Sequence, residues 1–289
     1  MGPGFKYHLA TISAIFFALT VGLVVGSLTV SPKLMRTFNG ALKGLNVTVR
    51  QDVITQRDQI ARYRKFLDSA LPTLIGGKLQ GKLVTIVQTG DYSEPIAGIQ
   101  QTLTQAGAQT AQVVTLDHTL TDQGTGFTQT LSDLQKRNSH IPTDKSRLIS
   151  AIAAALVKED RSSPSLLDTL QNAGLLNIRS DADYSLPVHL FIILAGSAAD
   201  STQRIADIDN LLILSLQHQG AVVVMAEPED AAVSDVAGYQ NLGIHISTVD
   251  DVDSDIGLCS LIYALHGYQG DFGVKPTARE LSPLQPEGS

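Results

Sequence analysis

A run of 26 residues without a formal charge lies between Lys6 and Lys33, and no other feature constrains this chain as strongly. From Leu9 to Val30 nearly every residue is apolar or small. Coiled as an α-helix, that stretch rises about 33 Å, enough to cross the hydrocarbon core of a typical bilayer. The sequence therefore predicts one N-terminal membrane anchor, with the rest of the chain on one side of the membrane.

The main alternative to an anchor is a cleaved signal peptide. Lys6 would be its short basic region, and Val24–Gly26 would supply small residues near a cleavage point. The apolar run is longer than the hydrophobic segment of about 7–15 residues in such peptides, which favours the anchor. Lys33 and Arg36 follow the helix, so the positive-inside rule places the remainder in the cytoplasm, although long translocated domains often disregard that rule.

Residues 33–77 carry apolar side chains at steps of three and four, which is the spacing of a coiled-coil seam. Because such a seam needs a partner helix, the pattern predicts a stalk that forms a homodimer. A single amphipathic helix packed against its own chain is the alternative. Pro72, Gly76 and Gly77 end the helix. The predicted seam consists of Leu42, Leu45, Val49, Val53, Ile60, Tyr63 and Leu67.

The net charge of −7 divides unevenly along the chain. Residues 1–82 hold eleven Lys and Arg against three Asp and Glu, whereas residues 83–289 hold ten against twenty-five. An acidic domain repels nucleic acid, whose recognition rests on neutralising phosphates, so nucleic-acid binding by this part is excluded. The basic part suits the anionic headgroups of a membrane.

From Leu83 onward, short β-branched runs alternate with amphipathic helices. This pattern indicates an α/β fold with a doubly wound, mostly parallel sheet that is covered on both faces. The expected strands are Leu83–Gln88, Val113–Leu116, Val188–Leu194, Ala221–Ala226 and a short one near His245–Thr248. The expected helices are Pro95–Ala106, Ser146–Lys158, Ser165–Ala173, Thr202–His218, Asp230–Gln240 and Asp255–Leu265, with Asp117–Lys145 a loop or marginal helix.

The predicted domains follow from these boundaries. They are a membrane anchor at 1–32, a coiled-coil stalk at 33–77, an acidic α/β head at 78–275 and a flexible tail at 276–289. The head carries no recognisable catalytic motif. Residues Thr89–Glu94 lack the glycine spacing of a phosphate-binding loop, and Ala195–Ala199 is not a nucleophile elbow. The sequence therefore predicts no enzyme and makes no cofactor evident.

Acidic residues follow several of the predicted strands, at the edge where ligands bind in such sheets. Thr248–Asp255 imitates the start of an EF-hand loop, but Ile256 occupies the glycine position, so that motif fails. A looser site for a divalent cation or a cationic partner is one interpretation, and helix capping is the other. A metal-dependent enzyme at this rim is a more remote hypothesis. The candidate binding rim consists of Asp91, Asp250, Asp251, Asp253 and Asp255.

Sulfur ligands are scarce. The single cysteine excludes an intramolecular disulfide and lies in an apolar stretch, which favours a core position for Cys259. Copper(I) prefers soft sulfur, and the remaining sulfurs, those of Met1, Met35 and Met225, form no motif.

Three blocks of sequence carry a resemblance to a known family. They are Tyr7–Ser27, the segment from Ile246 to Leu265, and Gly267–Lys275. Together with the predicted coiled coil, they resemble the mycobacterial MctB copper transport family. The resemblance implies an envelope protein whose head lies outside the cytoplasmic membrane, with a role in copper efflux or homeostasis. Relatives are also connected with cell-envelope and septation machinery, which implies an adaptor or scaffold that recruits another envelope protein.

The family label and the physical interpretation differ on one point. A single helix cannot line a pore, because a conduit through a bilayer needs several helices or a closed barrel. The expected role in copper efflux or homeostasis rests on the family resemblance alone. Scaffolding through the stalk and head is the activity that the residues themselves predict.

Overall fold

The computed structural model describes residues 3–29, 53–63, 65–67, 69–120, 125–137, 141–142, 144–158, 165–180 and 187–284. The chain divides into two units, Met1–Lys65 and Phe66–Ser289. In the first unit, α1 spans Pro3–Thr29, and the side chains of residues 11–26 are exposed. Among the residues that the structure describes, no helix combines the length and the apolar character needed to cross a membrane.

The predicted stalk is described only in part. Leu42, Leu45 and Val49 lie outside the described residues. Residues 53–63, 65–67 and 69–75 are helical, as the spacing predicts. The side chains of Val53 and Ile60 are 41% and 52% exposed, so in the single chain this part of the predicted seam faces solvent. A coiled coil is not shown, and it stays a prediction.

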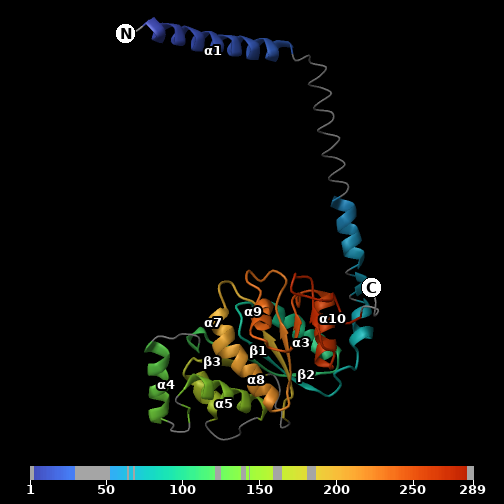
Figure 1. The fold of residues 1–289 in the computed structure, drawn as a ribbon. Coiled ribbons are helices and arrows are strands. Elements are labelled where there is room, and N and C mark those ends of the chain that lie inside the picture. Colours follow the sequence, from blue (N-terminus) through green and yellow to red (C-terminus); the bar gives the residue numbers. More distant parts are fainter. Residues whose placement is uncertain are drawn as a thin grey trace. The chain divides into compact units, whose positions relative to one another are not determined.

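The second unit combines a sheet with surrounding helices (Figure 1). The sheet has seven strands in the order β3-β2-β1-β4-β5-β6-β7. All neighbouring strands are parallel except β2 and β3. The prediction of an α/β fold with a mostly parallel sheet is therefore confirmed. The two short edge strands β3 and β7 were not predicted. The strands are β1 Leu83–Gln88, β2 Gln109–Leu116, β3 Leu176–Arg179, β4 Leu190–Leu194, β5 Val222–Ala226, β6 Ser247–Val249 and β7 Asp271–Phe272.

Helices connect these strands and cover the sheet (Figure 1). The predicted helix Asp230–Gln240 begins only at Val236, because Val233 instead forms a bridge with Ser197. The predicted helix Thr202–His218 is divided by a π-helical turn, η2. Part of the segment predicted as loop or marginal helix forms η1 and α4. The elements are α3 Pro95–Gln105, η1 His118–Leu120, α4 Thr125–Arg137, α5 Lys145–Val157, α6 Leu166–Asn172, α7 Thr202–Arg204, η2 Ile205–Asp209, α8 Asn210–His218, α9 Val236–Asn241 and α10 Asp255–Leu265.

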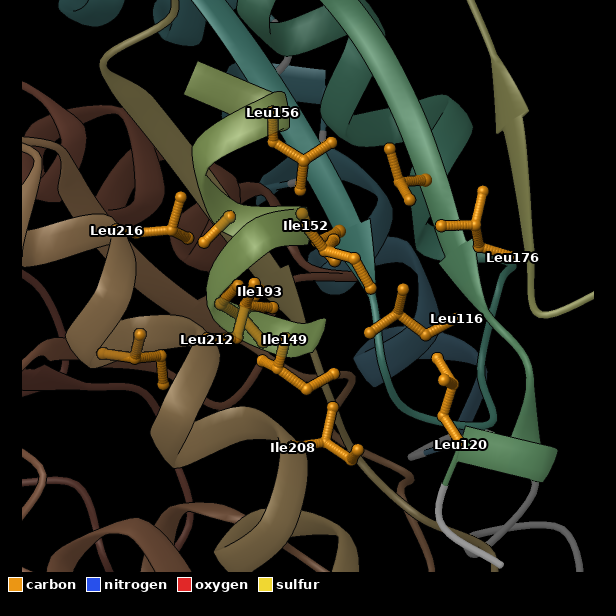
Figure 2. Close-up of a cluster of buried hydrophobic side chains, with 14 of the residues drawn as sticks. Leu116, Leu120, Ile149, Ile152, Leu156, Leu176, Ile193, Ile208, Leu212 and Leu216 are labelled. Carbon is orange, nitrogen blue, oxygen red and sulfur yellow. The ribbon is translucent and has the colours of Figure 1, made fainter. Parts of the chain in front are cut away.

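Alternating side chains of each central strand enter two hydrophobic cores. In β4, Phe191 and Ile193 face one core, while Leu190 and Ile192 face the other. Figure 2 shows the first core, where side chains of α5 and α8 gather against the sheet. The second core is formed with α3 and α10. This double burial is why the strands read as continuous apolar runs in the sequence.

The second core also includes the helical turns at 69–75. Leu71 and Ile75 are buried there together with Leu79. The hydroxyl of Tyr263 in α10 donates to the carbonyl of Leu74 at 3.3 Å. The last turns of the predicted stalk are therefore packed as part of the head.

Candidate functional site

The chain leaves the sheet centre in opposite directions after β1 and β4, so the crevice between their carboxyl ends is where doubly wound domains bind ligands. Here the two loops close that crevice. The N–H groups of Thr89 and Gly90 both donate to the carbonyl of Leu194 at 3.0 Å. A Cβ atom on Gly90 would lie 2.3 Å from the carbonyl oxygen of Gly196. The backbones are in direct contact where a phosphate would otherwise lie.

Arg204 fills the space beneath these loops and is only 9% exposed. Its Nη1 lies 3.0 Å from Asp209 Oδ2 and donates to Thr89 Oγ1 at 2.6 Å. Its Nη2 pairs with Asp235 and donates to Ser197 Oγ at 3.1 Å. The guanidinium thus joins the loops after β1 and β4 to the helical layer.

The π-helical turn explains how Arg204 and Asp209 meet. In an α-helix, residues five apart point in different directions, whereas a π-helix bonds residue i to i+5 and places them on one side. Because η2 spans Ile205–Asp209, the two charged side chains face the same buried site. π-Turns are rare and frequently mark functional positions, which makes this the most distinctive local geometry in the head.

The buried acids of this site have displaced pKa values. Burial raises the pKa of Asp209 to about 6, although the Arg204 charge and a hydrogen bond from Tyr239 oppose the rise. Burial and the neighbouring Asp209 carboxylate raise the pKa of Tyr239 well above its usual range. Burial lowers the pKa of Arg204, but the charges of Asp209 and Asp235 outweigh it and raise the pKa overall. Arg204 therefore remains a cation.

A second buried ion pair lies at the end of β5. Lys275 Nζ lies 2.8 Å from Glu227 Oε1 and also donates to the carbonyl of Pro228 at 2.8 Å. The other oxygen, Glu227 Oε2, accepts from the N–H of Asp235 at 2.8 Å, which links this pair to the Arg204 network. Burial raises the pKa of Glu227, and the hydrogen bonds from Lys275 and Ser234 oppose the rise.

Two acids of the predicted rim hold backbone segments together. Asp91 Oδ2 accepts from the N–H of Ala198 at 2.7 Å, across the β1 and β4 loops. Asp250 is buried and accepts from the N–H groups of Val274 and Lys275. Gly273 is essential to this second contact, because its φ is +138° and a Cβ would lie 1.9 Å from Asp250 Oδ1.

The other three rim acids lie around the start of α10. Asp253 Oδ1 accepts from the N–H of Glu229 at 2.7 Å. Asp251 is buried and accepts from Ser254 Oγ, while Ser254 in turn caps α10 and Asp255 begins it. Burial raises the pKa of Asp251 to about 6, and the charges of Asp250 and Asp253 raise it further while Ser254 opposes the rise.

The five acids therefore lie at the carboxyl ends of the strands. Asp91, Asp250 and Asp253 accept hydrogen bonds from backbone N–H groups of other loops and so connect these loops. In the part of the chain that the structure describes, no group of three or more His, Cys, Asp or Glu side chains converges on a metal position. Cys259 and Met225 are buried, at 4% and 0% exposure, and burial raises the pKa of the Cys259 thiol. Met1 and Met35 lie outside the described residues. The accessible donors suited to copper here are thus imidazoles rather than sulfur.

Sequence reasoning missed the central members of this site, Arg204, Asp209, Asp235 and Lys275. One signal was present. Asp209 is four residues from both Ile205 and Ile213, so it falls on the apolar stripe of its helix, where a charge must be paired. The partners of Asp209 could not be found in this way, because Arg204 lies at the other end of the π-turn and Tyr239 lies thirty residues away in α9.

Fold and site together define a class of protein: a doubly wound α/β domain whose ligand crevice is occupied by its own side chains. The family model described as "Copper transport outer membrane protein, MctB" matches residues 4–283, and the chain belongs to this family. It is similar to the copper transporter MctB of Mycobacterium tuberculosis H37Rv and of Mycobacterium bovis AF2122/97. Each is 21% identical over 318 aligned residues, which cover 97% of this chain and 99% of the relative.

Proposed function

We propose that the chain is a single-pass envelope protein that serves copper homeostasis as a scaffold rather than as a conduit or an enzyme. The observation that carries the proposal is the match to the MctB family over residues 4–283, combined with a head whose ligand crevice is closed by its own backbone and charges. The relatives are named copper transporters, and this is the source of the copper assignment.

The proposed anchor is the N-terminal helix. Its support is the sequence, whose charge-free run between Lys6 and Lys33 is long enough to cross a bilayer, while the helices that the structure describes add no membrane span to this argument. We place it in the cytoplasmic membrane with the head outside, whereas the family description names the outer membrane. Because one helix cannot line a pore, transport by this chain would require other proteins or act through them.

A topology experiment tests the anchor and its direction. Reporters that work only outside or only inside the cytoplasmic membrane are fused to the C-terminus of the full chain, and membranes are then fractionated. We expect the outside reporter to be active and the chain to remain at full length in the cytoplasmic membrane. An active inside reporter, a shortened chain or exclusive recovery in the outer membrane would overturn this placement.

Copper titration tests direct handling of the metal. Copper(II), and copper(I) under reducing conditions, are titrated into the purified full-length chain. Because Cys259 and Met225 are buried, we expect no stoichiometric tight copper(I) site among the described residues. Deletion of the gene should nevertheless raise cellular copper, and re-expression should restore it. Unchanged cellular copper after deletion would refute the role in copper homeostasis. Tight stoichiometric copper binding would refute the scaffold and show that the chain carries the metal itself.

A second candidate function is an adaptor that recruits another envelope protein through a dimeric stalk. Apolar residues recur every seven positions at Val53, Ile60, Leu67 and Leu74, and the first two are about half exposed in the single chain. β-Branched residues at such positions favour two-stranded parallel coiled coils. The double variant Leu45→Asp with Ile60→Asp should become monomeric and lose its partner in pull-downs. The matched double variant Arg57→Asp with Arg62→Asp changes charge off the seam and should retain both. An unchanged dimer in the seam variant would refute the adaptor.

A further inference from the structure

A groove lies where the parallel strands begin, at the end of the sheet that we call the amino edge. The filled crevice lies at the opposite end, the carboxyl edge, where these strands finish. β5 pairs with β6 only over Val224–Ala226, because β6 does not begin until Ser247. Before Val224, β5 forms no ladder pairs with the chain that leads into β6. The space left between these two segments is bordered by the loop that precedes β7. The result is a hollow of about 700 Å³, within the range of about 300–1,000 Å³ that is usual for small-molecule sites.

The lining of this groove forms hydrogen bonds but carries little net charge. It includes the carboxamides of Gln217, Gln240 and Gln269. Its guanidinium, from Arg279, is 3.2 Å from the carboxylate of Asp271, so each neutralises the other. A phosphate or a metal ion would find no uncompensated opposite charge from this pair. The Nε2 groups of Gln217 and Gln240 already donate to acceptors of the protein itself, so these two side chains offer their carboxamide oxygens to a ligand. Such acceptors suit a neutral ligand rich in hydroxyl groups.

An aromatic ring stands at the rim. Tyr268 is 49% exposed, and its ring packs edge-on against Tyr263 with centroids 5.3 Å apart. Tyr263 is itself held by Lys78, whose Nζ lies 4.2 Å from the ring centroid. Tyr268 therefore offers an apolar ring with a polar tip in a supported position. The floor adds small apolar side chains, among them Val222, which is 41% exposed.

We propose that this groove binds a short segment of a neutral saccharide chain. A sugar ring has an apolar C–H face that packs on an aromatic ring, and hydroxyl edges that pair with carboxamides. The supported Tyr268, the three glutamines and the neutralised Asp271–Arg279 pair provide this combination on one concave surface. The inference stands independently of copper, so its failure would leave the family assignment and the proposed scaffold untouched.

Calorimetry with the purified full-length chain tests the proposal. The probes are three neutral tetrasaccharides: the N-acetylglucosamine tetramer, cellotetraose and maltotetraose. We expect at least one to bind with a Kd of about 1 mM or tighter. The variants Tyr268→Ala and Gln269→Ala should each weaken it by about tenfold or more while keeping the thermal midpoint. The control Gln105→Ala removes an exposed glutamine of α3 that does not line the groove, and it should bind as the unchanged chain does.

Three outcomes would overturn the proposal. The first is no heat with any probe up to about 10 mM, beyond the weakest affinity expected. The second is binding that Tyr268→Ala and Gln269→Ala leave unchanged, because the sugar would then lie elsewhere. The third is binding of a neutral capped hexapeptide at this groove in place of every sugar, which would make the ligand a peptide.

Discussion

The two edges of the head's sheet are formed by the same strands but differ in how their ends are completed. At the carboxyl edge, the loops after β1 and β4 touch, and Arg204 and Lys275 neutralise buried acids beneath them. At the amino edge, β6 starts late and leaves a hollow lined by largely neutral side chains. Doubly wound domains ordinarily bind ligands at the carboxyl edge. In this chain that edge is filled by the chain's own loops and ion pairs, and the open groove lies at the amino edge.

The largest effect should follow from removing the buried guanidinium. Arg204→Met leaves Asp209 and Asp235 without their cation in a water-poor site, so we expect unfolding free energy to fall by about 3–5 kcal/mol in urea titrations. The control Arg147→Met breaks an exposed surface pair with Asp144 and should leave the unfolding free energy almost unchanged. Equal losses in the two variants would show that the carboxyl edge does not hold the fold.

A methyl group at the closed crevice should have the next largest effect. Gly90→Ala places Cβ against the carbonyl of Gly196 and forces the loops apart, so unfolding free energy should fall by about 1–3 kcal/mol. The matched change Gly98→Ala lies inside α3, where the nearest atom is 4.0 Å away, and should raise stability by about 0.5–1 kcal/mol. Effects of the same sign would contradict the loop contact.

Asp251 should make the stability of the carboxyl edge depend on pH. Its pKa of about 6 lies above the ordinary value of 3.8, so the folded chain binds this proton more tightly than the unfolded chain. The resulting stabilisation is complete below about pH 4 and is lost as pH rises through 6. Asp251→Asn stays neutral, and should exceed the parent by about 1–2 kcal/mol at pH 8 but match it at pH 4.

Urea titrations from pH 4 to 8 provide this comparison. The surface control Asp133→Asn, which breaks an exposed pair with Lys136, should leave the pH profile unchanged. A parent and an Asp251→Asn profile that run parallel across the whole range would rule out this carboxyl as the origin of the pH dependence.

The smallest effect is expected at the amino edge. His245 lines the groove and is exposed, so His245→Gln should change unfolding free energy by less than about 0.5 kcal/mol. Urea titration beside the Arg204→Met variant makes the contrast between the two edges direct. A loss above about 1 kcal/mol would show that the amino edge is also part of the stabilising framework.

Much of the architecture was readable from the sequence because its signals are local. The strand Leu83–Gln88 and the helix Asp255–Leu265 have the predicted boundaries, since an apolar run and a helical stripe with a cap each fit within a short window. The strands β3 and β7 escaped notice, because two to four residues at a sheet edge leave too little pattern. The break in Thr202–His218 escaped it too, since a π-turn inserts only one residue into the helical period.

The acidic rim shows more clearly what could not be predicted from the sequence. The sequence placed Asp91 and Asp250 after strands, and parallel strands do bring both to one edge. It could not show that Asp250 would be buried by a segment more than twenty residues later, with Gly273 shaped to fit against it. Nor could it show that Lys275 would reach Glu227. Residues 276–284, predicted as tail, carry backbone contacts such as Arg279 N–H to Asp271 O at 2.8 Å.

The sequence by itself determined the types of element, the parallel sheet buried on both faces and the separation of a basic from an acidic part. These follow from periodicity and composition, which are properties of neighbouring residues. Only the tertiary structure decided which edge of the sheet is filled and which is open. That choice depends on strand order, on the late start of β6 and on charges more than thirty residues apart, such as Arg204 and Asp235, that meet only when the chain is folded.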